Sequence, residues 1–238
     1  MHARLSRALT HLGLTLLLSA PACRAPAGAV AELDPLAFSL GAIHTRAGTP
    51  AQLLEAGNDA IEIFPALRPR EAALFALYLE RAGRACGLEA EVEVRPGAGG
   101  CTVVASGEHK QLLAAHYPLG PGGDSASVPA SLPALEPAQP ALDPAHAFFD
   151  ERARVLGFLA GVHLRHGERG ALQFANATRK AELVRALLIE FGCTEVRLES
   201  SPRGSYPSVR RLSYVAGPEI AALFERVDAE AAALEERG

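Results

Sequence analysis

The chain has 238 residues, of which 49% are hydrophobic and 21% are charged, and its formal net charge is −4. These values are ordinary for a soluble globular protein, and they exclude general disorder and the collagen and coiled-coil classes. Because the chain as a whole is not basic, it is not a nucleic-acid binder of the simplest kind. The length is compatible with one large domain or with two small ones.

Residues 1–30 have features of an export signal and also of a folded N-terminal helix. Arg4 and Arg7 precede a short apolar run, and Ala25-Pro26-Ala27 follows it as a candidate cleavage site. The run is too short to span a membrane, which takes about 20 residues. We therefore keep two interpretations of this segment. It is either an export or lipoprotein signal within residues 1–27, or an N-terminal helix of a cytoplasmic protein.

Two apolar stretches, 36–48 and 155–167, are built on the same plan. Each contains His, one further residue and then Arg, and each closes with Gly two residues after that Arg. Such internal similarity indicates a duplicated structural unit. Each stretch begins with a predicted helix, and small residues inside the two helices would allow them to approach closely. These small residues are Gly41, Ala42, Ala160 and Gly161.

The same order of elements follows each apolar stretch. Alternating apolar residues predict strands, and apolar residues three and four positions apart predict helices. In the first unit, residues 31–117, we expect strands at 60–63, 88–95 and 101–106 and helices at 71–82 and 108–116. In the second unit, residues 147–227, we expect strands at 171–174, 194–200 and 209–216 and helices at 180–191 and 218–227. The middle helix of each unit is expected to end at a glycine, Gly83 or Gly192.

The segments outside the two units, and their charges, differ in character. Residues 118–146 contain seven prolines, which predicts an extended linker, and residues 228–238 form an acidic tail. Residues 31–117 carry 7 Lys or Arg against 11 Asp or Glu, whereas residues 151–226 carry 12 against 8. The predicted strand of the first unit would also expose Glu91, Glu93 and Arg95. An anionic partner would therefore meet the second unit rather than the first.

The candidate binding residues lie on the strands of the second unit. If the apolar residues of these strands face the helices, Gln173, Arg197 and Arg211 project from the opposite face. Arg203 and Arg210 lie at the hairpin. Arginine at these places could contact phosphate, and Gln173 could touch a base edge. The alternative is a solvated face on which Glu and Arg pair across the strands.

The duplicated unit resembles the LAGLIDADG homing endonucleases, with motif positions 40–48 and 159–167. The resemblance implies an α+β fold. In that fold, two pseudo-symmetric αββαββα units form a saddle-shaped antiparallel sheet backed by helices. These enzymes bind their divalent metal with an acidic residue just before the final glycine of the motif, and those positions are Ala47 and His166 here. We therefore expect no catalytic residue, no metal site and no cofactor.

Within that superfamily the sequence resembles the N-terminal region of the WhiA family of sporulation regulators, over roughly residues 31–227. A stretch like Gly157 to Gly161 and a helix ending in Phe191-Gly192 carry this resemblance. WhiA-like proteins continue into a helix-turn-helix domain, which is not legible in this sequence.

The resemblance implies a non-catalytic, DNA-associated regulator of transcription or cell division in the cytoplasm. Its DNA contact would be one-sided, through the second unit, and a separate helix-turn-helix protein could be its partner. No membrane span is expected. Two alternatives stay open. One is a protein-interaction module that has lost DNA binding, and the other is an exported lipoprotein built on the same scaffold.

Overall fold

The computed structural model describes residues 32–43, 60–61, 67–89, 91–97, 99–116, 147–168, 170–175, 177–202 and 209–235. All of them belong to one compact body, Glu32–Gly238. The predictions for residues 1–30, for the linker at 118–146 and for Arg203 lie outside the described residues. No helix within the described ranges is both long enough and apolar enough to cross a membrane.

The second unit contains the full order of elements expected from the sequence. They are α5 (Arg152–His166), β4 (Gly167–Glu168), β5 (Ala171–Ala175), α6 (Thr178–Glu190), β6 (Thr194–Ser200), β7 (Val209–Val215) and α7 (Pro218–Glu235). A short 3-10 helix, Ala147–Phe149, precedes α5. The strands pair antiparallel in the order β4-β5-β7-β6.

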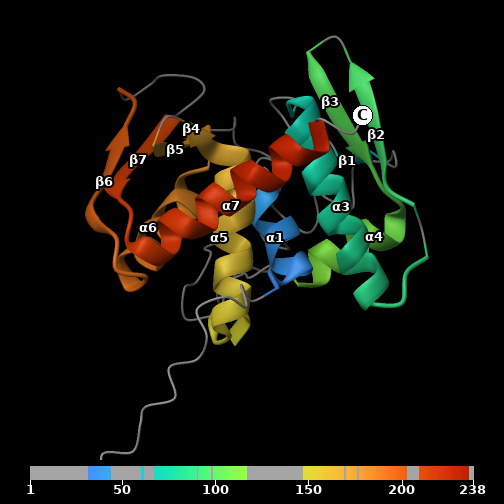
Figure 1. Ribbon diagram of the computed structural model, residues 1–238, viewed down its shortest axis with the longest axis horizontal. Helices are drawn as coiled ribbons and strands as arrows, with labels where there is room; N and C mark the ends of the chain where they lie inside the picture. The colour runs from blue at the N-terminus through green and yellow to red at the C-terminus, as the bar shows by residue number, and fades with distance from the viewer. Residues whose placement is uncertain are drawn as a thin grey trace, which may run out of the picture. The chain divides into compact units, whose positions relative to one another are not determined.

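The first unit repeats this arrangement. Its described elements are α1 (Pro35–Ala42), β1 (Ala60–Ile61), α3 (Pro69–Ala85), β2 (Glu93–Gly97), β3 (Gly100–Val104) and α4 (Gly107–Ala115). Its strand order, β1-β3-β2, corresponds to β5-β7-β6 of the second unit. The predicted α+β fold is confirmed, with one antiparallel sheet and its helices in each of two similar units (Figure 1).

The two middle helices end differently, although both are predicted to stop at a glycine. α6 is followed by Gly192, whose φ of +75° is typical of a residue that terminates a helix. The prediction for Gly83 is wrong, because α3 continues past it and the left-handed residue is Gly87, with a φ of +78°. Gly83 lies inside α3, where a Cβ would overlap the imidazole ring of His109 in α4.

The hairpin of the first unit is tighter than predicted. The strand expected at 88–95 begins only at Glu93, and the expected loop residues Pro96 and Gly97 belong to β2. Gly97 pairs directly with Gly100, so the two strands are joined by a two-residue turn. Gly100, the first residue of β3, has a φ of +137°, a conformation that glycine adopts far more readily than a residue with a side chain.

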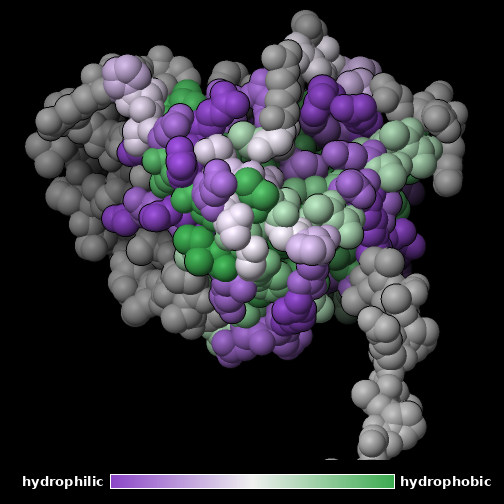
Figure 2. Space-filling view, turned by 60° about the vertical axis from the view of Figure 1, so that its left-hand side comes forward, coloured by the Kyte–Doolittle hydropathy of each residue, from purple (hydrophilic) through white to green (hydrophobic). Residues whose placement is uncertain are grey.

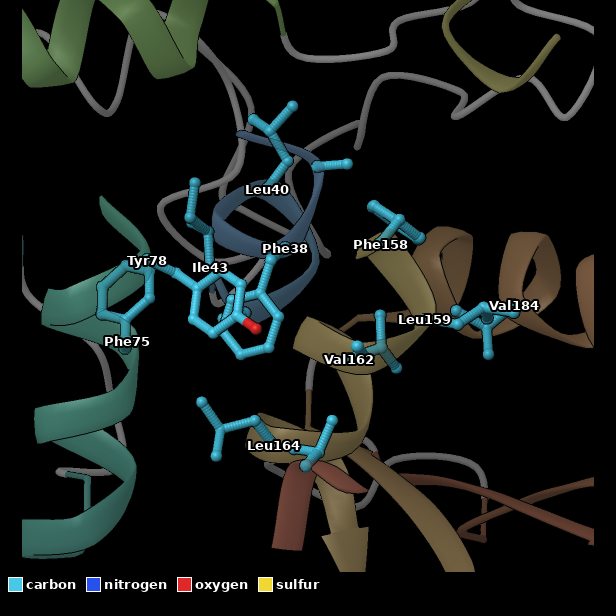
Figure 3. Packing of buried hydrophobic residues seen from close by; sticks show 14 of the residues in the cluster. Phe38, Leu40, Ile43, Phe75, Tyr78, Phe158, Leu159, Val162, Leu164 and Val184 are labelled. Carbon is cyan, nitrogen blue, oxygen red and sulfur yellow. The ribbon is translucent and has the colours of Figure 1, made fainter. Parts of the chain in front are cut away.

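The contact between α1 and α5 lies at the centre of the hydrophobic core. Phe38 of α1 stacks on Tyr78 of α3 with 3.9 Å between the ring centroids. Phe158, Leu159 and Val162 of α5 are buried in the same cluster (Figure 3). One continuous apolar cluster therefore joins the two units, although the sequence separates them by a long linker.

The last helix, α7, continues without a break from the predicted helix at 218–227 into the acidic tail, whose residues 228–237 the sequence also predicts to be helical. Asp228, where the acidic tail was expected to begin, lies within this helix, and Ala231 is buried. Tyr78 of α3 donates a hydrogen bond of 3.0 Å to Glu230. Burial, together with the Glu230 carboxylate, raises the pKa of Tyr78 to about 12. α7 therefore packs against the first unit as well as against its own (Figure 1).

Candidate nucleic-acid interface

Gln173, Arg197 and Arg211 share one face of the second sheet. Antiparallel pairing places Gln173 directly opposite Arg211, and Arg197 lies one row further along. All three side chains are exposed, whereas Leu172 and Leu212 on the other face are fully buried. Because directly paired residues point to the same side of a sheet, the three side chains meet on one surface. We call this surface the exposed sheet face.

A carboxylate lies within the exposed sheet face. Glu199 in β6 is paired with Arg211, so Gln173, Arg211 and Glu199 form one row across three strands. A Glu opposite an Arg is typical of a solvated sheet surface, and it reduces the positive charge that Arg211 offers to a phosphate. Arg197 is instead paired with Ser213. The two arginines are therefore not equivalent.

Arg210 does not join this face. It is paired with Phe174 and with Ser200, which places its side chain on the helix-facing side of the sheet, and it is half-buried. Arg210 lies at the start of the second strand of the hairpin, as expected, but neighbouring residues of a strand point to opposite faces, so it does not share the face of Arg211.

The corresponding strand of the first unit, β2, offers no net positive charge. Glu93 and Arg95 are both exposed there, and Arg95 donates two hydrogen bonds to Glu93, of 2.7 and 3.0 Å. The bond to Arg95 lowers the pKa of the Glu93 carboxyl. Glu91, just before the strand, is also exposed.

A pocket of about 930 Å³ lies where α5 ends, next to the exposed sheet face. Arg68 and Arg70 line it from the start of α3, Arg165 from the last turn of α5, and Gln173 from β5. Burial lowers the pKa of Arg165 to about 10, against the opposing effect of the Glu71 carboxylate, so its guanidinium stays charged at neutral pH. No local sequence pattern marks these three arginines as a group, because they come from segments that lie far apart in the chain.

Two histidines of the second motif, residues 159–167, line this pocket. His163 stacks on Phe224 with 4.1 Å between the ring centroids, and its Nε2 lies 3.1 Å from a carboxylate oxygen of Asp228. Burial lowers the pKa of His163. His166 places its Nδ1 3.0 Å from the backbone carbonyl oxygen of Gln173, which ties the end of α5 to β5.

The donor set of the pocket does not fit a divalent metal. The Nε of Arg68 donates a hydrogen bond of 2.6 Å to Glu71, and the backbone N–H of Arg68 donates one of 3.0 Å to the same carboxylate. Asp228 is likewise engaged, by His163. Within the described ranges, no group of three or more His, Cys, Asp or Glu side chains could hold a metal ion. Hard divalent cations such as Mg²⁺ and Ca²⁺ need several oxygen ligands at once.

The four small residues at the centre lie where α1 crosses α5. All of them are buried: Gly41, Ala42, Ala160 and Gly161. A Cβ added to Gly161 would overlap the carbonyl oxygen of Phe38, and one added to Gly41 would overlap that of Phe158. The backbones of the two helices are therefore in direct contact, which at these positions requires glycine.

Lys180 of α6, which no sequence motif marks, is fully buried beside the end of α1. Its Nζ donates hydrogen bonds to the carbonyl oxygens of Leu40 (3.2 Å), Gly41 (2.5 Å) and Ile43 (2.6 Å). Because the last carbonyls of a helix lack partners within it, a side chain of the second unit caps a helix of the first. Burial, together with the positive charge of Arg165, lowers the pKa of Lys180 to about 7.

Comparison with known proteins gives a likeness in structure but none in sequence. No protein-family model matches the chain, and no curated protein sequence matches it. Among solved structures, the chain is similar to the LAGLIDADG homing endonuclease I-DmoI in its complex with DNA and Ca. The TM-score is 0.46 at 12% sequence identity, and the match covers 80% of this chain and 96% of that chain.

Proposed function

We propose that the protein associates with DNA through the exposed sheet face of its second unit, without catalysing a reaction. The observation that supports this proposal is the gathering of Gln173, Arg197 and Arg211 on one surface. Guanidinium groups bind phosphate oxygens directly, and a glutamine amide can read a base edge. The excess of Lys and Arg in residues 151–226 favours the same partner.

The non-catalytic part of the proposal rests on the side chains at the ends of the motif stretches. Ala47 and His166 stand where the resemblance to the homing endonucleases would require acidic residues. Of the three carboxylates that line the pocket, Glu71 and Asp228 are already engaged by an arginine and a histidine, and Glu168 is exposed to solvent. Such a pocket would hold a phosphodiester without supplying the metal that activates water for its hydrolysis.

More specifically, we propose that the protein is a cytoplasmic regulator of WhiA type that acts in transcription or cell division. Contacts to phosphate position a protein on DNA but carry no sequence information directly. A separate helix-turn-helix protein would therefore supply the choice of target. The motif positions and the repeated units of the sequence support this assignment.

Exchange of Arg197 for alanine should weaken binding to random-sequence duplex DNA. Loss of one phosphate contact reduces the slope of log K against log salt by about 0.9, which corresponds to about eightfold in affinity at 0.1 M salt. Arg211→Ala should have a smaller effect, because Glu199 already offsets that charge. Fluorescence anisotropy at several salt concentrations measures both.

The matched control for these variants is Arg84→Ala, which removes one exposed charge at the far end of α3. It should bind DNA like the wild type. A wild-type protein that fails to bind duplex DNA even at low salt would contradict the proposed function.

Exposed apolar side chains favour the alternative function, a protein-interaction module. Ile189 in α6 and Val215 at the end of β7 are 51% and 53% exposed. These elements lie on the side that Figure 2 brings forward, where hydrophobic residues lie among hydrophilic ones. This alternative predicts that the protein has a stable protein partner, that Ile189→Asp or Val215→Asp releases this partner, and that the protein does not bind DNA.

The exported alternative concerns residues 1–27, outside the described residues, and the intact mass of the mature protein tests it.

A further inference from the structure

Cationic side chains from both units line the pocket at the end of α5. Arg68 and Arg70 come from the start of α3 in the first unit, and Arg165 comes from the last turn of α5 in the second. The volume of about 930 Å³ lies in the range of pockets that hold small-molecule ligands. A phosphate group and the sugar attached to it would therefore fit.

The carboxylates of the pocket do not exclude an anion. Glu71 is bonded to an arginine at the start of α3. Asp228 contacts His163, whose lowered pKa leaves the ring without a compensating charge, but 73% of the Asp228 side chain is exposed to solvent. Glu168 in β4 is exposed to solvent, where its charge is well screened. A ligand that brings its own negative charge meets Arg70 and Arg165 rather than a ring of free carboxylates.

The direction of α3 adds to this preference. The helix is 17 residues long and begins at Pro69, so its first residues, with their partial positive charge, line the pocket. The Glu71 carboxylate already accepts the backbone N–H of Arg68, which places one negative group at this helix end. Because Glu71 already occupies this helix end, the preference of the pocket for an anion rests chiefly on its arginine side chains.

We propose that this pocket binds a phosphate group, held by Arg70 and Arg165 without a divalent metal. Arginine suits this task because its planar guanidinium forms two parallel hydrogen bonds with phosphate oxygens. Gln173 belongs both to the pocket wall and to the exposed sheet face, so a DNA strand that crosses that face leads to the pocket. For DNA as the source of the phosphate, the inference rests on the proposed function. A free phosphate ester would bind by the same chemistry.

The test uses the full chain in EDTA with two probes, a short random-sequence duplex and a nucleoside monophosphate. Arg70→Gln removes a guanidinium from a half-buried position, and Arg84→Gln removes the same charge from the exposed far end of the same helix. Relative to Arg84→Gln, we expect Arg70→Gln to lower the affinity for the duplex about eightfold at 0.1 M salt. Arg165→Lys, which keeps the charge but not the planar fork, should also weaken binding. Circular dichroism verifies that each variant is folded.

The outcomes separate this inference from the proposed function. Loss of duplex binding in Arg70→Gln supports the pocket, and the monophosphate then shows whether a free phosphate ester is also held. If Arg70→Gln matches Arg84→Gln with both probes while Arg197→Ala still loses the duplex, the pocket inference is overturned and the proposed function stands. If the wild type binds only the monophosphate, in a manner that depends on Arg70, the pocket is a site for a free phosphate ester and the proposed function is wrong.

Discussion

Replacement of Lys180 by methionine should lower the free energy of unfolding by about 3 kcal/mol or more. Methionine keeps most of the length of the side chain but has no donor. The carbonyl oxygens of Leu40, Gly41 and Ile43 would then stay buried without this partner. A buried polar group left unsatisfied costs about 1–3 kcal/mol, and three such groups share this ammonium. Urea denaturation followed by circular dichroism measures the loss.

The neighbouring residue on α6 provides the control. Arg179 is exposed and pairs with Glu182 on the surface at 3.4 Å, so Arg179→Met should change the stability by less than about 1 kcal/mol. If Arg179→Met and Lys180→Met lowered the free energy of unfolding by similar amounts, the hydrogen bonds from Lys180 to the end of α1 would not be the source of its contribution to stability.

The same variant also tests the protonation state of Lys180. Burial lowers the pKa of Lys180 from 10.5 to about 7. Between these two values the unfolded chain binds a proton that the folded protein does not bind. The stability of the wild type relative to Lys180→Met should therefore rise with pH above about pH 7, by at most about 1.4 kcal/mol per pH unit. Below about pH 7 the difference should be constant, because both states then carry the proton.

Gly161→Ala should destabilise the protein by about 3 kcal/mol. The added methyl group would overlap the carbonyl oxygen of Phe38 and would lie 2.8 Å from the backbone nitrogen of Ala42. Both atoms belong to the backbone of α1, which cannot rotate away as a side chain would. The two helices must separate, and the apolar side chains packed between them lose contact. Thermal and urea denaturation measure the effect, and Gly41→Ala should behave alike.

Gly107, at the first position of α4, is the matched glycine. A Cβ there meets no atom within 4 Å, so Gly107→Ala should be neutral or slightly stabilising, by at most about 1 kcal/mol. If Gly161→Ala were as harmless as Gly107→Ala, the direct backbone contact between α1 and α5 would be refuted.

Local patterns were sufficient to predict much of the second unit. The alternation in β6 and β7 places their ends within about one residue, because period-two patterning and turn residues act over short distances. The duplication also places the pair Gly41-Ala42 of one helix at the positions of Ala160-Gly161 in the other. Gly83 shows the limit of such reasoning. This glycine makes room for the imidazole of His109 in another helix, and rules for where a helix ends do not take such contacts into account.

The pocket and the buried cap could not be predicted for a related reason. Lys180 bonds to carbonyls of residues about 140 positions earlier in the chain, and nothing near it in the sequence marks it as buried. Arg68 and Arg70 line the pocket only because the start of α3 lies next to the end of α5 in the folded protein. The face on which Arg210 lies depends on the register of β7 with its two neighbouring strands, which the sequence alone does not give.

The reach of α7 has a consequence for how the gene could be divided. Glu230, near its end, accepts a hydrogen bond from Tyr78 of the first unit, while Phe224, nearer its start, stacks on His163 of the second. A fragment that stops at the end of the first unit would expose the surface of α3 that this helix covers. A fragment that holds the second unit alone would leave the last turns of α7 without a partner. The tandem halves are therefore no longer interchangeable modules, and separately expressed halves should fold only when they are mixed.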